Sequence, residues 1–254
     1  MRRRRPHATA TQRPAERPGG PPARPPTAEP SVPLVGLGAS AGGLEALEMF
    51  CTHMPPDSAM AFVVVTHMDP HATSLLPELL SRVTRMPVCE ATDGQVLTAN
   101  TVMVMPPGKY LTIAQGLLRV RDAIMTPHEV PLPIDTFFRS LAEDQQEKAM
   151  GIILSGTGTD GTLGAKAIKS MGGIIMVQDA QSARFPGMPQ SAVAAGLVDY
   201  VLAPDQMPSA LLTYVRGSYL TLSATAPATL AISPEVLQEI LSLLHSHTGH
   251  SFAA

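Results

Sequence analysis

The feature that most restricts the fold of this 254-residue chain is an alternation, from Pro33 onward, of short apolar runs with longer segments of helical periodicity. A strand covered on both faces is apolar at every position, and such runs separated by helices are typical of a parallel α/β sheet. The sequence therefore predicts an α/β fold. Buried strands are expected at 34–37, 61–66, 101–105, 151–154, 174–177 and 200–202.

Apolar residues at three- and four-residue steps predict helices over 44–54 and 135–148. The segment 88–122 differs, because polar and apolar residues alternate on both sides of Gln115-Gly116. This pattern predicts an antiparallel hairpin at a sheet edge.

The two ends of the chain have a different composition. Residues 1–33 contain nine prolines and no aromatic residue, and they hold seven of the 18 basic residues but two of the 21 acidic ones. We expect a disordered Arg/Pro-rich tail over 1–32, followed by one globular domain over 33–216. A linker is expected over 217–232, and an isolated C-terminal helix over 233–254.

Composition excludes several classes of function. The net charge of −3 divides into +5 for residues 1–33 and −8 for the remainder, which argues against nucleic acid as a partner. Two cysteines without a metal-ligand spacing, and Pro70 between His67 and His71, predict neither a disulfide framework nor a metal site. No apolar run is long enough to insert into a membrane, so we expect a cytoplasmic protein.

The first predicted strand runs into the glycine-rich turn 36–43, which has two interpretations. A dinucleotide loop would use helix amides to bind a pyrophosphate, but Ala41 stands where the third glycine is required. Alternatively, residues 38–42 form a G-x-S-x-G turn that exposes the Ser40 hydroxyl. A nucleotide-binding oxidoreductase therefore stays open as an alternative to a serine hydrolase.

A base and a carboxylate follow two other strands. His67 comes directly after the strand at 61–66, and Asp160 lies in the glycine-rich turn after 151–154. Because the carboxyl ends of parallel strands meet at one edge of the sheet, Ser40, His67 and Asp160 are expected to converge as a catalytic triad. Asp199, at the start of the last strand, is a competing candidate for the carboxylate.

Five ordered motifs resemble the catalytic domain of the chemotaxis protein-glutamate methylesterase family, CheB. They are found at 34–43, 64–68, 104–108, 153–161 and 185–189, and the resemblance spans about 33 to 216. It implies a doubly wound, mostly parallel Rossmann-like sheet. It also implies hydrolysis of glutamate γ-methyl esters on chemoreceptors, with glutamine deamidation as a further activity of many members.

The resemblance assigns roles residue by residue. Ser40 would be the nucleophile, His67 the general base and acid, and Asp160 the orienting carboxylate. Amides near Ala41 and Thr157 would stabilise the oxyanion. Met188 would line the substrate cleft, with packing in the core as the alternative. No metal or organic cofactor is implied.

The resemblance also implies partners. These are the cytoplasmic helices of methylated chemoreceptors and a receptor methyltransferase, fused or separate, because 233–254 resembles the start of that enzyme's N-terminal domain. Residues 1–33 are too short for the phosphoacceptor receiver domain that many members carry. A non-catalytic signalling module of the same fold is the alternative interpretation.

Overall fold

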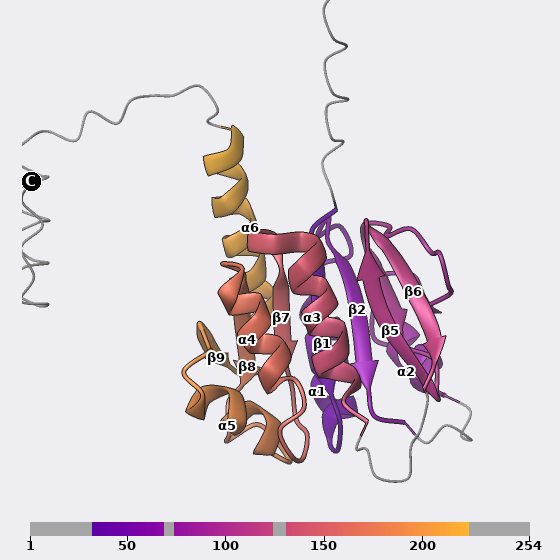
Figure 1. Cartoon of the computed structure of the whole chain (residues 1–254), viewed down its shortest axis with the longest axis vertical. Coiled ribbons are helices and arrows are strands. Elements are labelled where there is room, and N and C mark those ends of the chain that lie inside the picture. Colours follow the sequence, from indigo (N-terminus) through magenta and orange to yellow (C-terminus); the bar gives the residue numbers. More distant parts are fainter. Residues whose placement is uncertain (1–31, 69–73, 124–130, 224–254) are drawn as a thin grey trace, which may run out of the picture. The chain divides into compact units, whose positions relative to one another are not determined.

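The centre of the computed structural model is a seven-stranded sheet in which every neighbouring pair is parallel (Figure 1). The structure describes residues 32–68, 74–123 and 131–223. All six predicted strands are present, with ends that differ from the prediction by at most two residues. In sheet order the strands are β3 (Val88–Glu90), β4 (Thr101–Val104), β2 (Ala61–Thr66), β1 (Leu34–Ala39), β7 (Met150–Ile153), β8 (Ile174–Gln178) and β9 (Tyr200–Leu202).

The predicted hairpin forms, but outside the parallel sheet. β5 (Lys109–Ala114) and β6 (Leu117–Asp122) pair antiparallel as a separate two-stranded sheet that contacts α3 (Pro133–Gln145). Its buried Leu111, Ile113 and Leu118 belong to the hydrophobic core beneath α3, so the hairpin covers the face of the sheet and does not extend its edge. The strand that does occupy the edge is β3, which lies within the segment 88–122 predicted to form the hairpin.

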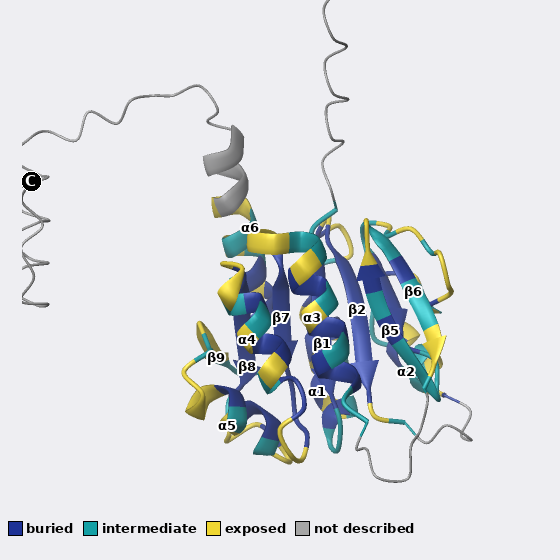
Figure 2. Cartoon of the chain, viewed as in Figure 1, coloured by how far each residue is buried: buried dark blue, intermediate teal, exposed yellow. Residues whose placement is uncertain are grey.

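Helices cover both faces of the sheet, as a doubly wound fold requires. Strand residues alternate between two buried clusters: Val63 packs with the α3 side, and Val64 with the α1 side. Figure 2 shows β1, β2, β7 and β8 as a buried layer, whereas the edge strand β9 and the hairpin strand β6 carry exposed residues. One face carries α1 (Gly43–His53), α2 (Leu76–Ser81) and α6 (Met207–Ser223), and the other carries α3, α4 (Thr162–Ser170) and α5 (Gly187–Ala194).

The strand order changes direction beside β1, which lies between β2 and β7. The chain first builds the sheet outward through β2 and β4, then returns to add β7 on the other side of β1. In open α/β sheets, ligands bind at the carboxyl ends of strands next to such a switch point. Ser40, His67 and the turn that carries Asp160 follow β1, β2 and β7, the three strands that meet there.

The C-terminal boundary differs from the prediction. Helix α6 continues to Ser223, so the predicted linker cannot begin at residue 217. The rest of that linker, the predicted helix over 233–254 and the predicted tail up to Ser31 lie outside the described residues. Among the helices that are described, none has the length and apolar character needed to cross a bilayer.

Candidate active site

Ser40 occupies a tight turn between β1 and α1. Its N–H donates to the Ser155 carbonyl at 2.9 Å, which ties the turn to the end of β7. Gly42 has φ 66°, a left-handed conformation that glycine adopts without strain, and it starts α1. This strand-turn-helix geometry matches the nucleophile turn predicted from the G-x-S-x-G pattern.

His67 lies between Ser40 and Asp160. Its Nδ1 is 3.2 Å from Ser40 Oγ, and its Nε2 is 3.0 Å from Asp160 Oδ2. A neutral ring that donates its Nε2–H to the carboxylate leaves Nδ1 free to accept the serine proton. The structure therefore brings together the three side chains that the sequence placed in one site.

The Asp160 carboxylate is held by backbone groups from two turns. Oδ2 accepts the N–H of Ile134 at 3.0 Å, and Oδ1 accepts the N–H groups of Asp135 at 2.8 Å and Gly161 at 2.9 Å. Ile134 and Asp135 lie in the first turn of α3, where unpaired amides and the helix dipole favour a negative charge. Asp160 is only 3% exposed, so its position and orientation are fixed.

The neighbours of His67 change its proton affinity. The hydrogen bond to Asp160 raises the pKa of His67 above its ordinary value, and partial burial opposes that rise. The negative charge of Asp160 and the backbone of Pro131 raise the pKa further. The imidazolium that forms when the ring takes a proton is thereby stabilised.

Asp199, the competing carboxylate, lies elsewhere. It forms an ion pair with Lys169 at 2.6 Å and accepts the N–H of Ile175 at 2.7 Å. These partners place it near the amino ends of β8 and β9, whereas the site lies at the carboxyl ends. Asp160 is thus the carboxylate that contacts His67.

Both residues expected at the oxyanion have suitable backbone groups. Within the described part of the chain, the N–H groups of Ala41 and Thr157 donate no hydrogen bond, so both are available to a ligand. The Met188 side chain is fully buried, so it follows the packing alternative and does not line the substrate cleft. It packs against Gly156 beneath Ser40, where a Cβ on Gly156 would lie 2.1 Å from Met188 Sδ.

Two polar residues at the site had no clear sequence signal. Asp135 is buried beside Asp160 and accepts the N–H of Gly164 at 2.7 Å, which joins the first turns of α3 and α4. Pro133, a favoured first residue of a helix, could have indicated where α3 begins. Thr66 is 7% exposed, and its hydroxyl has no hydrogen-bond partner in the described structure.

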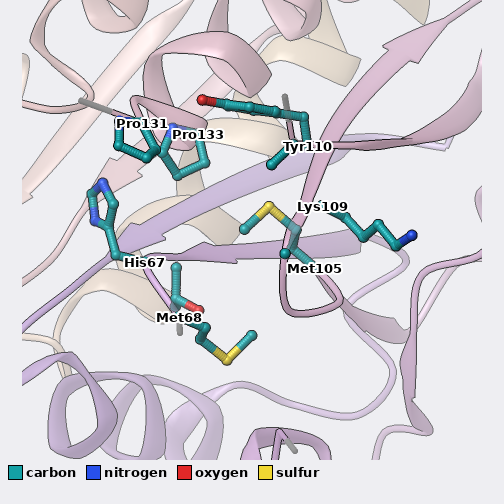
Figure 3. A pocket seen from close by; sticks show the side chains of 10 residues that line it. His67, Met68, Met105, Lys109, Tyr110, Pro131 and Pro133 are labelled. Atoms are coloured by element: carbon teal, nitrogen blue, oxygen red, sulfur yellow. The ribbon is translucent and has the colours of Figure 1, made fainter. Parts of the chain in front are cut away.

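Two cavities flank the catalytic side chains. The imidazole cavity, of about 280 Å³, is lined by His67, Met105, Tyr110, Pro131 and Pro133 among others. Figure 3 shows the His67 ring at one end of it, beside the two prolines, with the Lys109 side chain pointing away from that ring. The leucine cavity, of about 240 Å³, is lined by Ser40, Thr66 and the side chains of Leu44, Leu47, Leu75, Leu76 and Leu79 among others.

Comparison with known proteins identifies the family. The family model described as CheB methylesterase matches residues 35–211, most of the chain. The chain belongs to the CheB methylesterase family. The resemblance drawn from the five motifs is therefore confirmed.

Other members of the CheB family agree with this assignment. The chain is 34% identical to protein-glutamate methylesterase/protein-glutamine glutaminase 6 of Anaeromyxobacter dehalogenans, over 72% of this chain and 54% of the relative. It is also 34% identical to the protein of Geobacillus kaustophilus with the same activities in its name, over 74% and 55%. The chain thus spans about half the length of these curated relatives.

A solved structure matches the fold as well. The crystal structure of the Thermotoga maritima CheB methylesterase catalytic domain superposes with a TM-score of 0.67 at 30% identity. The match covers 72% of this chain and 99% of that domain. The doubly wound parallel fold predicted from the resemblance is confirmed.

Proposed function

We propose that this chain hydrolyses glutamate γ-methyl esters on chemoreceptors by a Ser-His-Asp mechanism. The observation that carries the proposal is the continuous contact from Ser40 Oγ through His67 to the buried Asp160 carboxylate. A hydroxyl, a base and an orienting carboxylate in this order form an activated nucleophile. Membership of the CheB methylesterase family supports the substrate class.

In the proposed reaction, Ser40 Oγ attacks the ester carbonyl carbon while its proton passes to His67 Nδ1. The imidazolium then gives that proton to the methoxy oxygen as the ester C–O bond breaks, and methanol leaves. Water attacks the acyl-enzyme, with His67 again as the base, and restores the Ser40 hydroxyl. Atoms and charge balance without a metal or an organic cofactor.

Negative charge on the carbonyl oxygen needs donors in place before the reaction. We assign this role to the backbone N–H groups of Ala41 and Thr157, which lie in the turns that follow β1 and β7. Because the donor is the backbone N–H, this role does not depend on the side chain that Ala41 or Thr157 carries. Removing one such donor in a hydrolase costs about 10² to 10³ in kcat.

The replacement Ser40→Ala tests the nucleophile. We expect turnover to fall by about 10⁴- to 10⁶-fold, because the attacking oxygen is lost. The measurement is methanol release from methylated chemoreceptor. Ser209→Ala, which removes an exposed hydroxyl on α6, is the matched control and should retain full activity. Undiminished methanol release by Ser40→Ala would refute the assignment of Ser40 as the nucleophile, whereas no release by the wild-type chain would favour the non-catalytic signalling module.

Deamidation belongs to the same proposal. Attack on a glutamine side chain follows the same path, except that His67 must protonate an amide nitrogen and ammonia leaves. The relatives that carry glutaminase in their names support testing it. Ammonia release from receptor glutamines should be lost in Ser40→Ala together with methanol release.

The partners and location follow from the substrate. We propose that the chain acts in the cytoplasm on the receptor's helices, and that a receptor methyltransferase, fused or separate, supplies the ester. Methylated receptor should therefore bind the Ser40→Ala variant, and unmethylated receptor should bind it more weakly. Equal binding of both receptor forms would contradict recognition of the ester.

A further inference from the structure

The two cavities contact different catalytic residues. Among the described residues, Ser40 lines the leucine cavity but not the imidazole cavity, and His67 lines the imidazole cavity but not the leucine cavity. Thr66 and Met68 form the wall that the cavities share. The two halves of an ester that is attacked by Ser40 therefore meet two chemically different environments.

Proton transfer determines which half lies on which side. The leaving oxygen must receive its proton from His67, so the alcohol half faces the cavity that the imidazole lines. The acyl half stays bonded to Ser40 Oγ after the alcohol has gone. It consequently extends toward the cavity that Ser40 lines.

The leucine cavity suits an apolar acyl group. Its side walls are leucines from α1 and α2, and its volume of about 240 Å³ exceeds the roughly 150 Å³ at which an apolar cavity in another protein binds benzene. Leu75 is 63% exposed at the mouth, while Leu47 is buried at the base. Apolar surface around a nucleophile favours substrates that cover it.

The Thr66 hydroxyl is an independent sign that a ligand binds here. Side chains alternate along β2, and Phe62 and Val64 belong to the core on the α1 side, which places Thr66 on that same side. An unpartnered buried hydroxyl is unfavourable unless a ligand supplies the missing hydrogen bond. Ser40 and Ser74 also line the cavity, and the Ser74 hydroxyl accepts the N–H of Leu76. Apart from the nucleophile, Thr66 thus offers the unpartnered hydroxyl in a mostly apolar wall.

We propose that the leucine cavity is the acyl subsite of this enzyme, and that it selects esters with an apolar acyl chain near one hydrogen-bonding group. The methylenes of an esterified glutamate and the peptide group beyond them fit that description. This proposal rests on the proposed Ser40 chemistry. It adds that the acyl half of the ester lies in the leucine cavity and the alcohol half in the imidazole cavity. It assigns Thr66 as a residue that contacts the acyl half.

Acyl-chain length provides the test. We expect kcat/KM of the full chain to rise about fifteenfold from p-nitrophenyl acetate to p-nitrophenyl butyrate, because each of the two added methylenes contributes about fourfold when buried. Leu79→Trp, which fills the cavity, and Leu75→Asn, which makes its mouth polar, should abolish that rise. Asparagine is favoured where Leu75 stands, at the N-cap of α2, so the helix is retained.

Matched variants separate the outcomes. Val96→Asn alters a residue with 64% exposure that lines neither cavity, and it should keep the wild-type dependence on chain length. A dependence that persists in Leu75→Asn and Leu79→Trp but is lost in Tyr110→Ala, on the imidazole side, would overturn the assignment. Hydrolysis of no ester at all would instead contradict the proposed function.

Thr66→Val tests the polar contact. Valine has nearly the same shape and removes a hydroxyl that has no partner, so we expect an unchanged or higher Tm. For a peptide carrying a glutamate γ-methyl ester, KM should rise about threefold to tenfold, since one hydrogen bond to substrate is lost. For p-nitrophenyl butyrate, which lacks the peptide group, KM should stay the same. An unchanged KM for the peptide would remove Thr66 from the subsite.

Discussion

His67 presents its two nitrogens in the opposite sense to the histidine of a chymotrypsin-type triad. There Nε2 faces the serine and Nδ1 the aspartate, whereas here Nδ1 faces Ser40 and Nε2 faces Asp160. The proton path is the same, because both nitrogens of imidazole can accept or donate. What is shared between such triads is the contact order and not the atom names.

The raised pKa of His67 predicts the pH dependence of activity. The ring must be neutral to accept the Ser40 proton, so kcat/KM should rise with pH and reach half its maximum above the ordinary value of 6.5. In Asp160→Asn the main cause of the raised pKa is gone. The midpoint should move to lower pH, and the plateau should fall by about 10⁴-fold. Rate profiles with p-nitrophenyl acetate between pH 5 and 9 test both shifts.

The raised pKa of His67 also makes the stability of the fold depend on pH. A histidine with a raised pKa in the folded state stabilises the fold at pH values below its unfolded pKa, and loses that contribution as pH rises through the folded pKa. The free energy of unfolding of Asp160→Asn should therefore differ from that of wild type more at pH 6 than at pH 9. An equal difference at both values would contradict the coupling.

Asp135 carries a second prediction at this scale. Burial raises its pKa, the Gly164 N–H opposes that rise, and the charge of Asp160 adds to it. Ionising Asp135 therefore costs stability as pH rises above the ordinary value of 3.8. Asp135→Asn should gain in unfolding free energy relative to wild type between pH 4 and 7, measured by urea denaturation. Asp135→Ala leaves the Gly164 N–H unpaired and should lose about 1–3 kcal/mol.

Sequence reasoning found the residues that have a local pattern. Ser40 follows a strand and is flanked by glycines, and His67 and Asp160 also come shortly after strands, so the rule for strand ends brings them together. Asp135 and Thr66 lie inside ordinary helix and strand patterns. The role of Asp135 depends on its contact with the distant Gly164, and that of Thr66 on the lack of a partner in the folded chain. A single sequence reveals neither.

At the scale of elements, the strands that could be predicted are those with long apolar runs. β3 has three residues and ends in Glu90, so its membership of the sheet depends on pairing with β4 and not on its own composition. In the hairpin, polar and apolar residues alternate clearly. This alternation predicts how its two strands pair but not which surface of the molecule they cover. The leucine cavity could not be predicted, because it requires the position of the six-residue helix α2 against α1.

The close approach of α5 to the Ser40 turn gives a prediction for Gly156. A Cβ at this position would lie 2.1 Å from Met188 Sδ and 2.9 Å from Ser40 Cβ. Gly156→Ala should therefore displace the nucleophile, with at least a tenfold loss of kcat and about 1–3 kcal/mol of stability. The assays are ester hydrolysis and urea denaturation.

Gly116→Ala is the control for that change. Gly116 has φ 71° and no atom within 4 Å of an added Cβ, so alanine there introduces backbone strain without a clash. It should lose about 1–2 kcal/mol and keep its kcat. A normal kcat in Gly156→Ala would show that the turn can relax around the added methyl group.

At the scale of the whole molecule, the described members of both hydrophobic cores lie between residues 32 and 215. The first strand is anchored by the Pro33 carbonyl, which accepts the N–H of Ala61 at 2.9 Å. A chain reduced to residues 32–223 should therefore unfold at a Tm within about 3 °C of the full chain, since less than 1 kcal/mol is expected to be lost. It should hydrolyse p-nitrophenyl acetate with the same kcat/KM. A markedly lower Tm would reveal contacts from the removed residues.

The anchoring of Asp160 has a consequence for how such a chain would lose its activity in evolution. Besides its contact with His67, the carboxylate joins the start of α3 to the loop after β7. Selection for a folded protein would preserve this aspartate even where hydrolysis is no longer needed, while Ser40 and His67 would be free to drift. In related chains, an aspartate at the position of Asp160 thus indicates only that the fold is kept. A serine and a histidine together at the positions of Ser40 and His67 indicate that hydrolysis is kept.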